Sequence, residues 1–87
     1  MGNKNRKASP EIRWRLATNL RRLREARGYT QLELARRTGL PNSYISKVEQ
    51  ELKNVTLANL EALADGLDCS LEDLFRRPKD LDSSRDP

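Results

Sequence analysis

The 87-residue sequence contains no histidine and a single cysteine, Cys69. Without these side chains it offers no Cys/His metal cluster, no Cys-His or Ser-His nucleophile pair and no intramolecular disulfide. We therefore expect a protein that is not an enzyme, that binds no metal or cofactor, and that fits a reducing cytoplasm. Cys69 is expected to be a small buried side chain rather than a reactive thiol.

Long apolar runs and aromatic residues are also scarce. The longest apolar run covers residues 62–64, whereas a membrane span needs roughly 20 residues. The N-terminus lacks the apolar centre of a secretory signal, so we expect a cytoplasmic protein without a membrane partner. Val and Ile are few, which disfavours strands, and a chain of this length rarely builds two cores. The composition therefore predicts one all-α domain with an aliphatic core.

Charge is distributed unevenly along the chain. The total is +4, but residues 1–27 carry +7, residues 28–53 carry +1 and residues 54–87 carry −4. A basic front end favours a polyanion such as nucleic acid, although a mixed, solvated surface explains the same numbers. The polar, basic residues 1–8 and the polar residues 78–87 are expected to be flexible, which leaves 9–77 as the folded domain.

The first expected helix begins at Ser9-Pro10, a hydroxyl cap followed by proline in the first turn, and ends near Gly28. Its apolar positions recur at helical spacing. Its arginines lie off that stripe, either on a solvated face or against phosphates. Trp14 also falls off the stripe and either packs against the C-terminal segment, lies across a subunit interface or is exposed. The stripe is Ile12, Leu16, Ala17, Leu20 and Leu23, and the arginines are Arg13, Arg21, Arg24 and Arg27.

Two short amphipathic segments follow, joined by a glycine-containing turn. Thr30 to Glu33 has the pattern of a capping box and begins a helix, and Gly39 permits a sharp turn. The next helix, from about residue 41 or 42 to residue 50, buries Ile45 and Val48. This pair predicts a helix-turn-helix, in which the second helix enters the DNA major groove.

The second segment of this pair keeps hydrogen-bonding side chains outside. Asn can bond adenine, Ser can donate or accept, and Lys can reach guanine or a phosphate. Many exposed short helices look the same, so the pattern alone also fits a solvated surface. The candidate base-contacting residues are Asn42, Ser43, Ser46 and Lys47.

Two further helices complete the expected domain. Thr56 caps one that ends near Gly66, with an apolar stripe of Leu57, Leu60, Leu63 and Ala64. Ser70 starts a short last helix whose apolar residues face inward or toward a second copy. These candidate dimer-interface residues are Leu71, Leu74 and Phe75.

The ordered series of motifs resembles the lambda-repressor/Cro (Xre) family of bacterial and phage regulators over about residues 16–75. The motifs are Thr30-Gln31-x-Glu33-Leu34-Ala35, Gly39-Leu40, Tyr44-Ile45-Ser46-x-x-Glu49, Leu57-x-x-Leu60-x-x-Leu63-Ala64-x-x-Leu67 and Leu71-x-x-Leu74-Phe75. The segment from Tyr44 to Leu57 is also similar to restriction-modification controller proteins. The resemblance implies a five-helix domain that binds double-stranded DNA at a palindromic operator as a homodimer.

Site roles follow from the same resemblance. Gln31 matches a phosphate-contacting glutamine at a helix start, where N–H groups and the helix dipole also favour a phosphate. The four candidate residues between 42 and 47 match base-facing positions, and Tyr44 matches a site that touches backbone or base edges. The same helix-start argument applies near Asn54 and Thr56, where the helix after the recognition helix begins, and Lys53 adds positive charge there. The expected backbone or mixed contacts are Gln31, Tyr44, Lys53, Asn54 and Thr56.

Two positions depart from the family pattern. Pro41 stands where Ser or Thr often caps the recognition helix, so Asn42 either caps that helix or reads a base. Glu51 stands where glycine is common, which places a carboxylate near phosphates and a residue ill suited to left-handed backbone.

The alternative to a DNA-binding regulator is an antitoxin or adaptor that uses the helix-turn-helix as a scaffold. Its contact surface would be the acidic last third of the chain. In either case we expect no small-molecule ligand, because 87 residues leave no room for a sensing domain.

Overall fold

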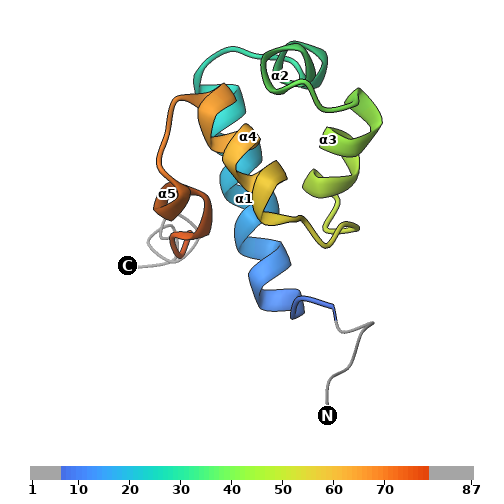
Figure 1. The fold of residues 1–87 in the computed structure, drawn as a ribbon. Helices are drawn as coiled ribbons and strands as arrows, with labels where there is room; N and C mark the ends of the chain where they lie inside the picture. The colour runs from blue at the N-terminus through green and yellow to red at the C-terminus, as the bar shows by residue number, and fades with distance from the viewer. Residues whose placement is uncertain (1–6, 79–87) are drawn as a thin grey trace.

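The computed structural model describes residues 7–78, which form five α-helices joined by short turns (Figure 1). This is the all-α architecture that the sequence predicts. Residues 1–6 and 79–87, which hold most of the expected flexible lead and tail, lie outside the described part. The helices are α1 (Pro10–Ala26), α2 (Gln31–Thr38), α3 (Asn42–Glu49), α4 (Leu57–Leu67) and α5 (Leu71–Phe75).

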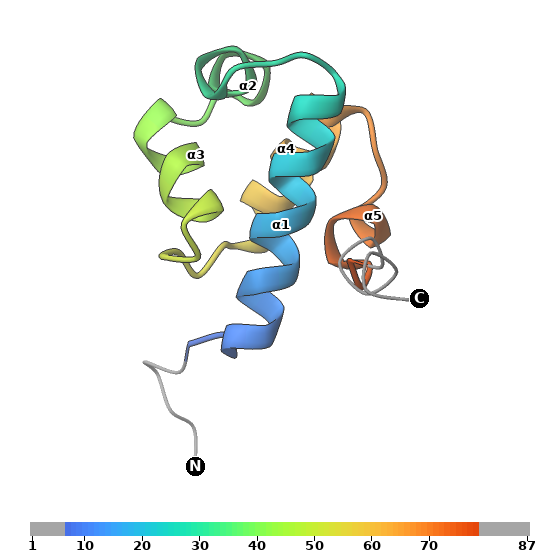
Figure 2. The same cartoon turned by 180° about the vertical axis from the view of Figure 1, so that it is seen from behind.

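Helix α1 runs through the centre of the molecule, with α3 and α5 on opposite sides in both views (Figures 1 and 2). Helix α2 crosses one end and contacts both α3 and α4. The core lies between these helices and is almost entirely aliphatic, as the composition predicts. It consists of Leu16, Leu20, Leu34, Ala35, Ile45, Val48, Leu63, Ala64, Leu67 and Leu74.

Hydroxyl side chains begin four of the five helices. Ser9, Thr30, Thr56 and Ser70 each accept a hydrogen bond from the backbone N–H three residues later. The capping box expected at α2 is only half present in the described residues, because the Glu33 carboxylate pairs with Arg37 (3.2 Å). The reciprocal box forms instead at α5, between Ser70 and Asp73.

Helix α4 ends at Leu67, one residue after Gly66, near which the sequence predicts its end, and Asp68 after it takes the left-handed conformation (φ 54°). Gly66 therefore lies within the helix, where α4 meets α2. A Cβ at this position would stand 2.5 Å from Thr38 Cγ2. The missing side chain lets the two helices approach closely.

Two leucines differ from the sequence prediction. Leu57, assigned to the buried stripe of α4, is 81% exposed. It is the first residue of that helix, whereas α2 covers the opposite end near Gly66. Leu74 is fully buried, because α5 lies along α1. Asn19 holds this contact: its buried Nδ2 donates to the carbonyls of Leu74 (3.0 Å) and Arg76 (2.7 Å).

Candidate nucleic-acid interface

The turn between α2 and α3 fixes the angle between the two helices. Gly39 is left-handed (φ 77°), and its N–H donates to the Ala35 carbonyl (2.8 Å). The Thr38 hydroxyl donates to the Leu34 carbonyl (2.9 Å) and accepts from the Leu40 N–H (3.1 Å). These bonds satisfy the backbone on both sides of the turn, so α3 is held at a defined orientation against α2.

Helix α3 begins without a side-chain cap. Pro41 is in the capping position and offers no side-chain acceptor, and Asn42 is the first helical residue. Both Asn42 and Ser43 are exposed. The alternative that Asn42 caps its own helix is therefore wrong, and its amide remains available to another molecule.

The middle of the outer face carries Ser46 and Lys47. Lys47 is exposed, while Ser46 is half-buried and its Oγ accepts from Gln50 Nε2 (2.9 Å). The bond leaves the Ser46 proton free to donate. Sequence reasoning missed Gln50, although its spacing of four from Ser46 is the signal that places both on one face of a helix. A glutamine amide can bond adenine in a bidentate way.

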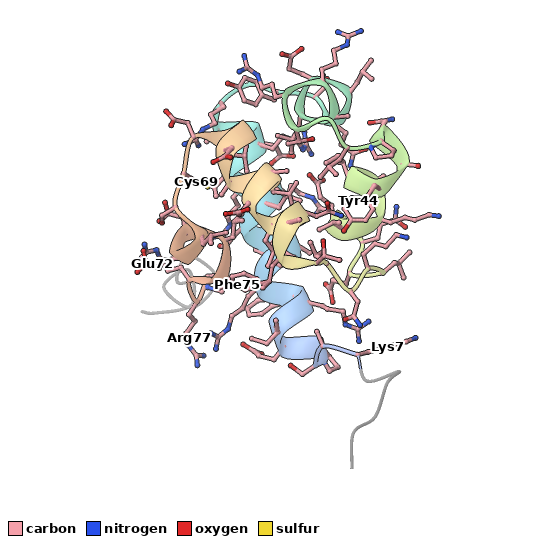
Figure 3. All side chains as sticks on the ribbon, viewed as in Figure 1. Lys7, Tyr44, Cys69, Glu72, Phe75 and Arg77 are labelled. Atoms are coloured by element: carbon pink, nitrogen blue, oxygen red, sulfur yellow. The ribbon has the colours of Figure 1, made fainter. Side chains whose placement is uncertain are left out.

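Tyr44 is held on the side of α3 that faces α4 (Figure 3). Its hydroxyl accepts from Asn59 Nδ2 (3.0 Å), and Lys53 Nζ lies 5.4 Å from the ring centroid. The expected contact residues Tyr44 and Lys53 thus lie together beside the loop that follows α3. The tyrosine proton stays available for a phosphate or base edge.

The end of α3 is fastened by a buried ion pair. Glu49 is 4% exposed, and its carboxylate receives Arg24 Nε (2.7 Å) and Nη2 (3.0 Å). The hydrogen bond to Glu49 raises the pKa of Arg24 above its ordinary value, so the guanidinium remains charged. Arg24 Nη1 also donates to the Tyr29 carbonyl (2.8 Å), which ties α1 to both the α2 entry and α3.

Gln31 belongs to the same network. Its Nε2 donates to Glu49 Oε1 (3.1 Å), and the side chain is half-buried at the start of α2. This bond uses one of the two amide protons, so the other can still meet a phosphate. The expected phosphate contact is therefore held in a fixed orientation by Glu49.

The arginines of α1 do not form a simple solvated face. Arg21 Nη2 donates to the Glu49 carbonyl (3.4 Å), and Arg13 Nη1 donates to the Glu51 carbonyl (3.3 Å). Together with Arg24, they place three guanidinium groups around the C-terminal end of α3. Positive charge at this end of a helix is favourable for the macrodipole.

The loop after α3 contains the remaining expected backbone contacts. Asn54 Oδ1 accepts from the Ala8 N–H (2.8 Å), and Thr56 Oγ1 accepts from the Asn59 N–H (3.1 Å). Both side chains therefore support the loop and the start of α4. Glu51 is left-handed (φ 65°), which is the geometry that glycine supplies elsewhere in the family pattern.

Helix α5 offers less surface to a partner than expected. Leu71 is 44% exposed and Phe75 is half-buried, but Leu74 has no exposed surface. The assignment of Leu74 to a dimer interface is corrected accordingly, because this side chain belongs to the core. Cys69 is half-buried against the core, where burial and then Asp73 raise the pKa of its thiol.

Within residues 7–78, no group of three or more His, Cys, Asp or Glu side chains is arranged to hold a metal ion. None of the helices in that part of the chain is long and apolar enough to span a membrane.

Comparisons with known proteins match this arrangement. The family model described as Helix-turn-helix (HTH_3) matches residues 20–74. The chain is 37% identical over 70 residues to a hypothetical transcription factor of Neisseria meningitidis serogroup B, which covers 80% of this chain. It spans 66% of that protein's length, just under two thirds.

Two solved structures of restriction-modification controller proteins are similar to the fold. C.AhdI from Aeromonas hydrophila has a TM-score of 0.70 at 40% identity, covering 72% of this chain and 96% of that one. C.Esp1396I, solved as a tetramer with its natural 35 base-pair operator, has a TM-score of 0.65 at 30% identity. The match to C.Esp1396I covers 68% of this chain and 78% of that one.

Proposed function

The chain belongs to the helix-turn-helix (HTH_3) family, and from this premise we propose that it is a sequence-specific regulator of transcription. It binds double-stranded DNA as a homodimer at a palindromic operator, and it acts in the cytoplasm without a catalytic step. The observation that carries the proposal is the outer face of α3. This face is exposed and polar at its start, while α1 holds its far end.

Helix α3 acts as the reading element. A major groove about 12 Å wide admits one helix, and α2 crosses the backbone above it. Asn42, Ser43 and Lys47 present exposed groups to base edges, and Ser46 donates its free proton. Gln31 contacts a phosphate with its remaining amide proton, while Lys53 adds charge beside Tyr44.

The narrower proposal is that the protein is a restriction-modification controller. Similarity to C.AhdI over nearly the whole of that protein supports it, as does similarity to C.Esp1396I, which was solved on its operator. Genes for a methyltransferase and an endonuclease beside this gene would support the controller assignment. Their absence would leave a regulator of other promoters.

The dimer surface is proposed to lie on α5. Leu71 is exposed and Phe75 is half-buried, so both provide apolar surface, and Leu74 supports them from the core. In a two-fold dimer of this kind the two recognition helices enter successive major grooves, about 34 Å apart.

The DNA-binding test uses two duplexes, the region upstream of the protein's own gene and a random sequence of equal length. We expect binding to both at low salt, with affinity falling steeply as salt rises, because lysine and arginine displace counterions from phosphates. Lys47→Ala and Ser46→Ala should weaken binding to the upstream duplex more than to the random one. Equal losses on both would contradict base reading, and no binding at low salt would favour the antitoxin or adaptor that uses the helix-turn-helix as a scaffold.

The dimer test compares two exposed leucines by sedimentation. Leu71→Glu should convert dimers to monomers while leaving the helical content unchanged. Leu57→Glu is the matched control, because it places the same charge on a more exposed leucine at the start of α4. If only Leu57→Glu lost its dimers, the interface would lie at the start of α4 and not on α5.

A further inference from the structure

Glu51, which follows the C-cap residue Gln50 of α3, has a backbone conformation that is unusual for glutamate. Glu51 is left-handed (φ 65°), and it closes a two-bond motif at the helix end. The Glu51 N–H donates to the Val48 carbonyl (3.0 Å), and the Leu52 N–H donates to the Lys47 carbonyl (2.9 Å). This position favours glycine, and a long side chain such as glutamate is strained there.

The charge of Glu51 is also placed unfavourably. Its carboxylate lies at the negative end of the α3 dipole, where cations are preferred. Among the described residues, no hydrogen bond or ion pair involves this carboxylate, and the residue is exposed. Glu49, two positions earlier, differs in every respect, because it is buried and bound by Arg24 and Gln31. The fold therefore does not need a carboxylate at position 51.

The position of Glu51 is nevertheless fixed. Arg13 Nη1 donates to its carbonyl (3.3 Å), and the two hydrogen bonds of the helix end hold its N–H and the next one. The turn connects Lys47, in the last turn of α3, to Lys53, which lies beside Tyr44. Because both lysines are proposed DNA contacts, we infer that a phosphate near this turn also meets the carboxylate of Glu51. Backbone strain that persists without local benefit suggests a functional reason.

We propose that Glu51 limits the affinity of this protein for DNA, by holding a negative charge against the phosphate backbone next to the recognition helix. The inference rests on the proposed DNA-binding function, because Glu51 is a residue whose charge weakens the binding to DNA. Exposed charge pairs change binding by about threefold each, so the two copies in a dimer lower affinity by about tenfold. Because phosphates are the same at every site, the effect is independent of sequence.

The experiment separates charge from backbone strain. Glu51→Gln removes the charge and keeps the strain, whereas Glu51→Gly removes both. We expect both variants to bind a random-sequence duplex about tenfold more tightly than the wild type at low salt. The gain should shrink as salt is raised, because the repulsion is screened. Only Glu51→Gly should also raise the melting temperature clearly.

Asp68→Asn is the matched control, since it removes the same charge from another exposed, left-handed residue (φ 54°), which ends α4 and lies outside the proposed DNA contacts and α5. It should leave DNA affinity unchanged, and sedimentation of every variant separates altered dimerisation from altered DNA contact. Unchanged affinity in Glu51→Gln overturns the inference. Weaker binding also overturns it, since the carboxylate would then accept a hydrogen bond, for instance from a cytosine amine. A wild type that binds no DNA contradicts the proposed function instead.

Discussion

The two ends of α3 are built in opposite ways. At the C-terminal end, Arg24 binds the buried Glu49 carboxylate, and Arg21 reaches the Glu49 carbonyl. At the N-terminal end, Pro41 provides no side-chain cap and Asn42 is exposed. The C-terminal end is thus fixed by the protein itself. The other end keeps hydrogen-bonding groups open, as a surface that meets DNA requires.

The largest expected effect comes from breaking the fixed end. Glu49→Ala leaves the guanidinium of Arg24, whose side chain is 11% exposed, without its carboxylate. We expect a loss of about 3 kcal/mol in the free energy of unfolding, because the half-buried Arg24 guanidinium keeps only the exposed Glu25 carboxylate (3.8 Å) and Gln31 also loses its acceptor. Chemical denaturation followed by circular dichroism measures it.

The control for this loss is Glu33→Ala, which breaks the exposed pair between Glu33 and Arg37 on α2. Its cost should be at most about 1 kcal/mol. Similar losses in the two variants would show that the Glu49 pair contributes no more than a surface pair, and would remove the contrast between the ends of α3.

A second, smaller loss of stability is expected at the turn between α2 and α3, which leads into the exposed N-terminal end of α3. Gly66→Ala places a methyl group against Thr38, whose hydroxyl holds the α2–α3 turn. Overpacking of this kind costs about 1–3 kcal/mol. Thermal unfolding measures the loss. Thr38→Ser in the same chain removes the crowding methyl and keeps the hydroxyl, so it should recover much of the stability; no recovery would place the strain elsewhere.

The smallest effect concerns the missing cap. Any replacement of Pro41 removes the restriction that proline imposes on the unfolded chain, which itself changes stability. Two variants that both lack proline are therefore compared with each other. Pro41→Ser should be about 1 kcal/mol more stable than Pro41→Ala, because only serine can accept from the first turn of α3. Denaturation midpoints of the pair provide the measurement. Equal stabilities would mean that the helix start needs no acceptor.

Much of the fold could be predicted because local signals agree with it. The hydroxyl caps at Ser9, Thr30, Thr56 and Ser70 and the helical spacing of apolar residues locate five helices. These signals depend on neighbouring residues in the chain. The end of α4 near Gly66 was predicted to within one residue, but the role of Gly66 was not: it allows α2 to approach closely, and Asp68 takes the left-handed conformation.

Features that depend on contacts between distant residues could not be predicted. Arg24 looked like a solvated arginine, but it pairs with Glu49, 25 residues later. Leu57 and Leu74 have the same helical periodicity, yet one is exposed and the other buried, because their helices meet the core at different places. At the candidate site, the residues on α3 were predictable from its exposed face. Which side-chain atoms remain free depends on partners such as Asn59 and Gln50.

The two hydrogen bonds that Asn19 donates to the end of α5 bear on the order of folding. They join residues 55 and 57 positions apart in the chain. A five-residue helix is too short to persist alone in water. We therefore expect α5 to form only once α1 has become a surface on which it can dock. The proposed dimer surface would then exist only in molecules in which α1 and α5 are in contact, so a chain without this contact would present nothing there for a second copy to recognise.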